Sequence, residues 1–236
     1  MSDEIRNLEP KALWNNFADL NAVPRPSKKE GRVIEFIKKF GESLGLPTSV
    51  DETGNVIIKK PASAGMENRE TVCLQSHLDM VHQKNNDTVF DFNTEGIQMY
   101  VDGDWVRAKG TTLGADNGIG VSTIMSILAS KDIAHPPLEA LFTIDEETGM
   151  TGAIGLKNWE IKKLKDCLAL KNLTAKDAMV SQRTQSFKSV RFYYTLFIFI
   201  YALCSLRCPC VLCGLLLHWV LRTRHLTTKD AMVSQS

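Results

Sequence analysis

Three short segments of the 236-residue chain carry the imidazole and carboxylate groups that are able to do chemistry. They are "SHLDMV" at 76–81, "GADNGIG" at 114–120 and "TIDEETGMTGA" at 143–153. Each segment alone has an ordinary explanation, since a single His-x-Asp is typical of a polar surface, Asp-Asn-Gly of a turn and consecutive acids of a solvated helix start. Together they are more informative, because each would close a strand or open a helix of one sheet. Such ends converge outside the carboxyl edge of a sheet, where ligands bind.

The residue types in these segments predict a metal site of nitrogen and oxygen ligands, which suits zinc and also manganese or cobalt. His77 and Asp79 follow the apolar run "TVCLQ" two positions apart, so in a strand they would share a face. His77 would bind an ion through one ring nitrogen while Asp79 accepts a hydrogen bond from the other. Asp116 could bridge two ions about 3.5–4 Å apart, and the adjacent Glu146 and Glu147 could divide metal binding and proton transfer between them.

Two helices are expected in the first part of the chain, over 11–23 and 27–46. Ser27 and Glu30 form a capping box in the sequence at the start of the second one. One apolar stripe along this second helix is made of Val33, Phe36, Ile37, Phe40 and Leu44. The sequence signals for the start, the buried face and the end of this helix therefore agree with one another.

Strands are expected at 48–50, 55–59, 71–76, 97–101 and 138–144, with a hairpin turn at 51–55 and a buried helix at 117–132. The last helix would be entered through a glycine-rich turn, in which the glycines let the backbone approach closely. Strands that alternate with helices indicate a largely parallel or mixed sheet covered on both faces. The predicted fold class is therefore α/β.

Composition narrows the class of protein. The chain is 44% hydrophobic and 23% charged, which is enough for one substantial core. Its 28 Lys and Arg against 27 Asp and Glu leave a net charge of +1, which gives no support to nucleic-acid binding. The amino terminus "MSDEIRNLEP" is acidic early and has no apolar signal-peptide core, so the cytoplasm is the expected location.

The sequence changes character after about residue 170, so we expect a domain over 1–170 and a divergent tail over 171–236. "LTAKDAMVSQ" at 173–182 returns as "LTTKDAMVSQ" at 226–235, as a segmental duplication or a gene-model error would produce. The apolar stretch at 192–221 is either a membrane helix, which would make the protein membrane-associated, or a tail that does not fold natively.

Four cysteines crowd into "CSLRCPCVLC" at 204–213. Their thiolates could bind zinc, but the cluster lacks the two Cys-x-x-Cys pairs of the common zinc modules and is embedded in apolar sequence. Buried or lipid-facing thiols are the favoured interpretation.

Taken together, "SHLDMV", "GTTLGADNGIGV" and "EALFTIDEETGMTGAIGL" resemble the aminoacyl-histidine dipeptidases, a family of di-metal peptidases. The resemblance runs from the amino terminus to about residue 160, with the three motifs in family order and with family-like spacing. It implies a zinc-peptidase-like catalytic domain, a mixed sheet flanked by helices. It also implies two divalent metal ions, zinc first, with manganese or cobalt as alternatives.

The resemblance implies a role for each matching residue. His77 would be a ligand of one ion, Asp116 the bridge and Glu147 a ligand of the other ion. Glu146 would be the general base, and Asp79 the catalytic-site aspartate behind His77. The implied reaction is attack of metal-activated water on the peptide bond of a dipeptide with carboxy-terminal histidine.

The family uses two further ligands, an aspartate beyond the glutamate pair and a histidine near the end of a longer chain. Asn172 is nearest in register to the aspartate, while Asp166 or Asp177 would need a shift. His218 and His225 lie in the tail, outside the family's context. We also expect the chain to lack the lid domain, which in these enzymes helps hold substrate and form the dimer.

We therefore expect the front half of a metal site, in a truncated enzyme that is inactive alone. One alternative is a membrane-tethered, non-catalytic fragment of such a peptidase. Another is a related tripeptidase or aminoacylase.

Overall fold

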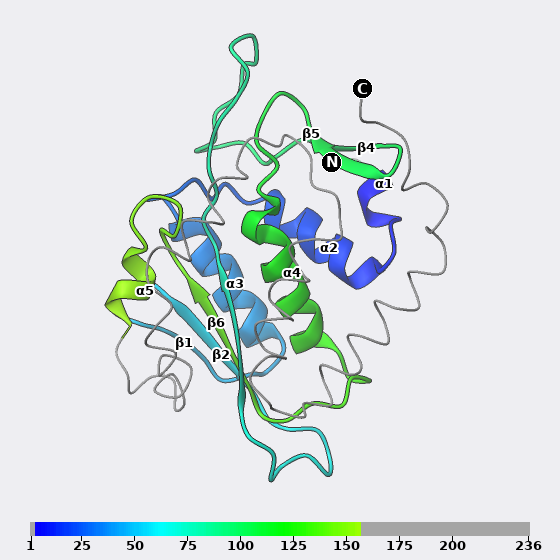
Figure 1. Ribbon diagram of the computed structural model, residues 1–236, viewed down its shortest axis with the longest axis vertical. Helices are drawn as coiled ribbons and strands as arrows, with labels where there is room; N and C mark the ends of the chain where they lie inside the picture. The colour runs from blue at the N-terminus through cyan, green and yellow to red at the C-terminus, as the bar shows by residue number, and fades with distance from the viewer. Residues whose placement is uncertain (1–2, 157–236) are drawn as a thin grey trace, which may run out of the picture. The chain divides into compact units, whose positions relative to one another are not determined.

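The computed structural model describes residues 3–156, which contain all three motifs (Figure 1). Several expectations lie outside the described residues. They are the domain boundary at 170, the duplicated segments, the apolar stretch at 192–221, the cysteine cluster at 204–213, and the candidate ligands Asp166, Asn172, Asp177, His218 and His225.

Three long helices dominate the described part: α2 (Lys11–Asn21), α3 (Gly31–Ser43) and α4 (Ala115–Ala129). All three were predicted from apolar periodicity, and their observed ends differ from the predicted ends by a few residues. Two short helices, α1 (Asp3–Arg6) and α5 (Thr151–Gly155), were not predicted. Within residues 3–156, no helix is both long enough and apolar enough to cross a membrane.

The apolar stripe predicted for α3 is confirmed at four of its positions. Val33 and Ile37 are completely buried, and Phe36 and Phe40 are partly buried against the same core. Leu44 is 36% exposed, so the prediction is wrong there, because the helix ends one residue earlier. The buried part of the stripe fixes α3 against the sheet.

Four strands form one mixed sheet in the described residues, in the spatial order β1 (Thr48–Val50), β2 (Val56–Lys60), β6 (Leu138–Thr143) and β3 (Val72–His77). The neighbours β1 and β2, and β2 and β6, are antiparallel, whereas β3 and β6 are parallel. The predicted hairpin turn at 51–55 joins β1 to β2. The predicted mixed sheet is confirmed.

Alternation along the central strands gives the sheet a helix-covered face. Val56 and Ile58 of β2 and Phe142 of β6 are buried in one core with residues of α2, α3 and α4. Ile57 and Leu141, one position out of phase, are buried on the opposite face. The expectation of helices on both faces is thus confirmed for the face that carries α2, α3 and α4.

The predicted strand at 97–101 exists as β4 (Met99–Asp102), but it does not join the mixed sheet. It pairs antiparallel with β5 (Trp105–Ala108), which was not predicted, in a two-stranded hairpin. Met99 and Val106 on the apolar side of this hairpin pack in a second core with Ile5, Trp14 and Phe17. Strand periodicity shows that a segment is extended, but the partner is decided by this packing.

We predict that Ile58→Ala lowers the free energy of unfolding by about 2–5 kcal/mol, because it leaves a cavity at a completely buried position of β2. The matched control is Ile154→Ala in α5, where the side chain is 76% exposed and the change should be within about 0.5 kcal/mol. Urea unfolding followed by tryptophan fluorescence measures both. Equal losses would contradict the core described above.

Candidate metal centre

The parallel pairing of β3 and β6 brings the first and third motifs together. His77 is directly opposite Thr143 in the register, and the N–H of Leu78 donates to the Thr143 carbonyl at 2.8 Å. Asp79 therefore follows one strand at the point where the loop containing Glu146 and Glu147 follows the other. The carboxyl ends of these two neighbouring strands form the base of the site.

His77 is almost completely buried, at 5% exposure, and contacts acidic groups through both ring nitrogens. Nε2 lies 3.1 Å from Asp116 Oδ1 and 3.9 Å from Glu146 Oε2. Nδ1 lies 3.1 Å from the Asp79 carbonyl oxygen and 3.3 Å from Asp79 Oδ1. Burial alone would lower the pKa of His77, but the hydrogen bonds to Asp116 and Asp79 outweigh it and raise the pKa to about 10.

Asp116 reaches the site from the first turn of α4, which begins irregularly. Gly114 precedes it in the left-handed conformation at φ 69°, and the dihedral angles of Asp116 and Asn117 are not helical. The Asp116–Asn117 peptide bond is cis. The Asp116 side chain is 64% exposed, and it contacts the buried imidazole with one oxygen while remaining accessible.

Glu146 and Glu147 lie in the loop that follows β6. Asp145 shapes this loop. Its backbone is in the left-handed region at φ 53°, and its carboxylate accepts hydrogen bonds from the hydroxyl groups of Thr148 and Thr151. Burial raises the pKa of Glu147, and the negative charges of the neighbouring carboxylates raise it further. The positive charge of His77 lowers it, and the resulting pKa of Glu147 is about 7. Burial also raises the pKa of Glu146.

Asp79 is fully buried, and its carboxylate holds the two sides of the site together. Its oxygens accept the backbone N–H of Glu146 at 3.0 Å, the backbone N–H of Glu147 at 3.2 Å and the Ser27 hydroxyl at 2.8 Å. Burial would raise the pKa of Asp79, but the hydrogen bonds from His77, Glu146 and Ser27 outweigh it and lower the pKa to about 2. The group is therefore a charged acceptor at neutral pH.

His77, Asp116 and Glu147 have the chemistry of a metal-ligand set. Each offers one ligand atom, and these atoms all lie within 4.8 Å of one another. One imidazole and two carboxylates suit zinc, manganese or cobalt, and a divalent cation would relieve the repulsion between the acids. The residues present therefore fit a metal ion. The roles that the sequence assigned to them, and to Asp79 and Glu146, remain predictions.

A second acidic group lies behind the first. Glu30, Asp79 and Asp145 also bring ligand atoms within 4.8 Å of one another, and all three are buried. This group offers no nitrogen ligand, and the oxygens of Asp79 already accept protein donors. His77, Asp116 and Glu147 are thus the better metal centre among residues 3–156.

Ser27 does not cap a helix. It was predicted as the capping residue of the second helix, but α3 begins at Gly31, Glu30 is its N-cap residue, and no side chain caps it. The Ser27 hydroxyl instead donates to Asp79, while Glu30 accepts the backbone N–H of Lys28. The capping-box prediction is therefore wrong, because a buried carboxylate far along the chain is the stronger acceptor.

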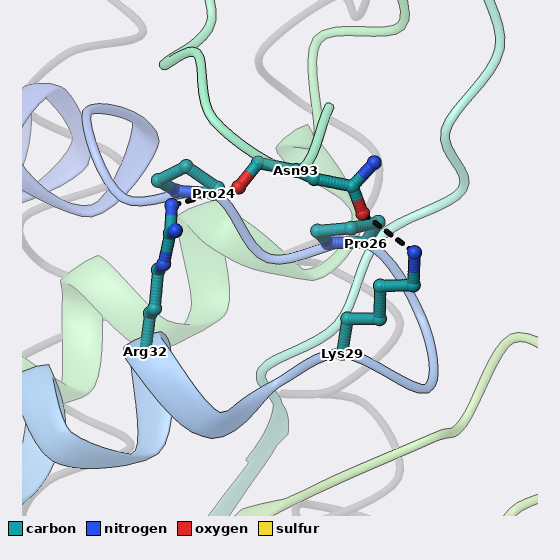
Figure 2. A pocket seen from close by; sticks show the side chains of 5 residues that line it. All are labelled: Pro24, Pro26, Lys29, Arg32 and Asn93. Atoms are coloured by element: carbon teal, nitrogen blue, oxygen red, sulfur yellow. Dashed lines mark hydrogen bonds between the residues drawn. The ribbon is translucent and has the colours of Figure 1, made fainter. Parts of the chain in front are cut away.

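A pocket of about 200 Å³ lies beside the segment that carries Ser27, lined by Pro24, Pro26, Lys29, Arg32 and Asn93 (Figure 2). Lys29 Nζ donates to the side-chain oxygen of Asn93, and Arg32 Nη1 donates to its backbone carbonyl, both at 2.7 Å. None of the five candidate site residues lines this pocket. It is separate from the metal centre.

The fold and the site together resemble one class of protein. A mixed sheet with helices on one face, and an imidazole and carboxylates near the carboxyl ends of two adjacent parallel strands, is similar to the catalytic domain of a peptidase.

Comparison with known proteins makes the relationship specific. The chain is 52% identical over 157 residues to the cytosol non-specific dipeptidase of Escherichia coli (strain K12), a match that covers 66% of this chain and 32% of that protein. The crystal structure of aminoacylhistidine dipeptidase from Vibrio alginolyticus is also 52% identical, with a TM-score of 0.66 over 69% of this chain and 34% of that one. Aminopeptidase PepT from Bacillus cereus is 27% identical, with a TM-score of 0.53 over 64% of this chain and 40% of that one. No protein-family model matches the chain.

The resemblance to aminoacyl-histidine dipeptidases is therefore confirmed for the amino-terminal part of the chain. The chain spans about a third of the length of these two relatives.

We predict that Asp79→Asn lowers the free energy of unfolding by about 1.5–3 kcal/mol, because the amide has the same shape but loses the charged acceptor. The control is Asp102→Asn, whose side chain is 55% exposed and pairs with Arg107, so the loss should stay below about 1 kcal/mol. Urea unfolding of the metal-free protein at pH 7 measures both. A loss no larger than that of the control would contradict the role of Asp79.

We also predict that affinity for Zn²⁺ rises between about pH 6 and pH 8, because ligands must lose their protons to bind the ion. The raised pKa values of His77 and Glu147 mean that protons compete with the ion at neutral pH: Glu147 loses its proton near pH 7, whereas His77 keeps its proton throughout this range until the ion displaces it. Isothermal titration calorimetry in buffers of different ionisation enthalpy gives the affinity and the protons released. Glu147→Gln should make the pH dependence shallower, and an affinity independent of pH would refute the assignment.

Proposed function

We propose that the function of this site is metal-dependent hydrolysis of dipeptides, most readily those with carboxy-terminal histidine. The observation that supports it most strongly is the convergence of His77, Asp116 and Glu147 within 4.8 Å. It occurs in a sequence 52% identical over 157 residues to a protein named as a dipeptidase. The two relatives differ in the substrate that their names give: one is a non-specific dipeptidase and the other an aminoacylhistidine dipeptidase. The preference for carboxy-terminal histidine is therefore a separate part of the proposal.

In this proposal His77, Asp116 and Glu147 would hold the divalent metal. A divalent ion bound there supplies Lewis-acid chemistry, since it polarises a peptide carbonyl and makes water more acidic. His77 would offer Nε2 to the ion, because its Nδ1 faces the carbonyl and carboxylate of Asp79. Asp79 thereby sets the tautomer and orientation of the imidazole.

Glu146 is the proposed general base. Its carboxylate stands 3.9 Å from His77 Nε2, beside the ligand set, and its side chain is 40% exposed, so water and substrate can reach it. Burial raises its pKa towards neutrality, which suits a group that must accept a proton from water and return it to the leaving amine. Its backbone N–H is held by Asp79, so the base and the imidazole share one support.

We also propose that residues 3–156 form only one side of the site. They supply one imidazole and several carboxylates. Hydrolytic two-ion sites need a complete ligand set, because that set fixes the coordination geometry and the open positions. We therefore expect the chain alone to release little histidine from a dipeptide. The same residues should support full chemistry when the remaining ligands are supplied.

A chimera tests the proposed function. Residues 1–156 of this chain replace the matching segment of the Escherichia coli dipeptidase, and release of free histidine from a dipeptide is followed by chromatography with Zn²⁺, Mn²⁺ or Co²⁺. We expect metal-dependent hydrolysis by the chimera, and a fall in kcat of about 10²–10⁴-fold on Glu146→Gln with metal content unchanged. The neighbouring Glu147→Gln should instead lower the metal content.

Three outcomes would contradict the proposal. A folded, metal-loaded chimera without activity would refute hydrolysis, and a Glu146→Gln chimera with full activity would refute the base. If the unmodified chain alone hydrolysed dipeptides as fast as the chimera, the proposal that residues 3–156 form only one side of the site would be wrong. A faster reaction with tripeptides or acyl amino acids would correct the substrate class.

A further inference from the structure

Arg25 is a buried cation that the proposed chemistry does not use. Its side chain is 1% exposed, and its guanidinium donates to oxygens on three separate segments. Nη1 donates to the carbonyl of Leu78 at 3.0 Å and to that of Asp79 at 3.4 Å. Nη2 donates to the carbonyl of Gly114 at 2.6 Å and to Asn21 Oδ1 at 2.9 Å.

Two of these segments carry the metal centre. The Leu78 and Asp79 carbonyls follow β3 directly after His77, and Gly114 is the residue from which α4 departs, two positions before Asp116. The Asp79 carbonyl also faces His77 Nδ1 at 3.1 Å. Arg25 therefore links the chain that holds the imidazole to the turn that holds the opposing carboxylate.

The backbone around Arg25 is fixed to the same strand end. Pro26 forms a parallel bridge with Met80, the Met80 N–H donates to the Arg25 carbonyl at 3.2 Å, and the Ser27 N–H donates to the Met80 carbonyl at 3.4 Å. The prolines on both sides of Arg25 favour the extended backbone that this pairing needs. The Arg25 side chain therefore extends from a fixed backbone position beside the metal centre.

The turn before α4 is shaped to receive the guanidinium. Asn21 donates to the Leu113 carbonyl at 3.1 Å while it accepts from Arg25, so it connects the turn and the cation a second time. A Cβ at Gly114 would lie 2.5 Å from Arg25 Nη2, and one at Gly118 would lie 2.7 Å from it. Gly114 also needs the left-handed conformation, at φ 69°.

A fixed fork of donors suits this place better than a single ammonium group would. Arg25 contacts oxygens on both sides with different nitrogens, which the planar guanidinium can do and a lysine cannot reproduce. A buried cation is tolerated here because the carboxylates of Asp79, Asp116 and Glu147 lie near it.

We infer that Arg25 is a positioning residue of the metal centre: its guanidinium fastens the Gly114 turn to the carboxyl end of β3 and so sets Asp116 against His77. The inference rests on the proposed function insofar as the two side chains are taken as metal ligands. The link between the two segments can be measured without any metal.

The test compares Arg25→Lys with Arg32→Lys in the full chain. Arg32 is an exposed arginine a few residues along the chain, and its Nη1 donates only to the Asn93 carbonyl among the bonds that the structure describes. For each variant, calorimetry gives the Zn²⁺ affinity, thermal unfolding gives the stability of the metal-free protein, and the Co²⁺ absorption spectrum reports ligand geometry. Hydrogen exchange of the metal-free protein reports protection of residues 112–120.

We expect Arg25→Lys to weaken Zn²⁺ binding by about 10–100-fold, to alter the Co²⁺ spectrum and to speed exchange at 112–120, whereas Arg32→Lys changes none of these. If Arg25→Lys does not fold, Asn21→Ala replaces it, and this variant should weaken Zn²⁺ binding in the same direction but by less. A folded variant with normal affinity, spectrum and exchange would overturn the inference. A loss of stability alone, with normal Zn²⁺ affinity, would also overturn it, because it would show a packing role only.

The experiment separates this inference from the proposed function. If the unmodified chain binds no Zn²⁺, the proposed metal chemistry fails, and exchange at 112–120 then decides the role of Arg25 by itself. Faster exchange in Arg25→Lys than in Arg32→Lys supports the link between β3 and the Gly114 turn. Equal exchange refutes it.

Discussion

The site depends on a single buried carboxylate, that of Asp79. A charge removed from water costs several kcal/mol unless it is fully hydrogen-bonded, and Asp79 meets this requirement with donors from three parts of the chain. They are the Ser27 hydroxyl, the His77 ring and the consecutive backbone N–H groups of Glu146 and Glu147. These bonds can form together only because β3 and β6 run parallel and end side by side. The same requirement therefore stabilises the fold and assembles the acidic loop beside the imidazole.

The electrostatic balance follows from this arrangement. Four carboxylates lie close together at the site, those of Asp79, Asp116, Glu146 and Glu147, and they shift the pKa of His77 or of one another. Arg25 and His77 are cations near these carboxylates. Without a metal, protons on His77 and on the crowded carboxylates reduce the repulsion. A divalent cation would do so more effectively, at the cost of releasing those protons. Like-charged carboxylates gathered around one point in this way would suit a cation.

The sequence predicted the parts of this site that depend on local spacing. His77 and Asp79 were placed at a strand end, and Asp116 and the glutamate pair were placed at neighbouring ends, because apolar runs and turn residues mark where strands stop. The predicted mixed sheet and the long helices follow from the same patterns. Which of Glu146 and Glu147 binds metal and which is the base rested on the family resemblance, and the comparisons support that resemblance over the amino-terminal part of the chain.

What the sequence could not predict depends on contacts between distant segments. Ser27 has the spacing of a helix cap, and only the bridge between Pro26 and Met80 places its hydroxyl on Asp79. Arg25 lies between two prolines and carries no local signal of burial, yet it joins residues more than fifty positions away. The strand at 97–101 has a clear period of two, but only packing against the first helices pairs it with β5 rather than with the mixed sheet.

The measurement that tests the account most directly is a crystal structure of the Zn²⁺-soaked protein with anomalous scattering data collected at the zinc edge. We predict an anomalous peak about 2.0–2.2 Å from His77 Nε2 and from oxygens of Asp116 or Glu147. Asp79 should remain hydrogen-bonded to the backbone of Glu146 and Glu147, outside the coordination sphere. A peak at another place in the protein, or no peak at saturating Zn²⁺, would contradict the claim that these residues form a metal centre.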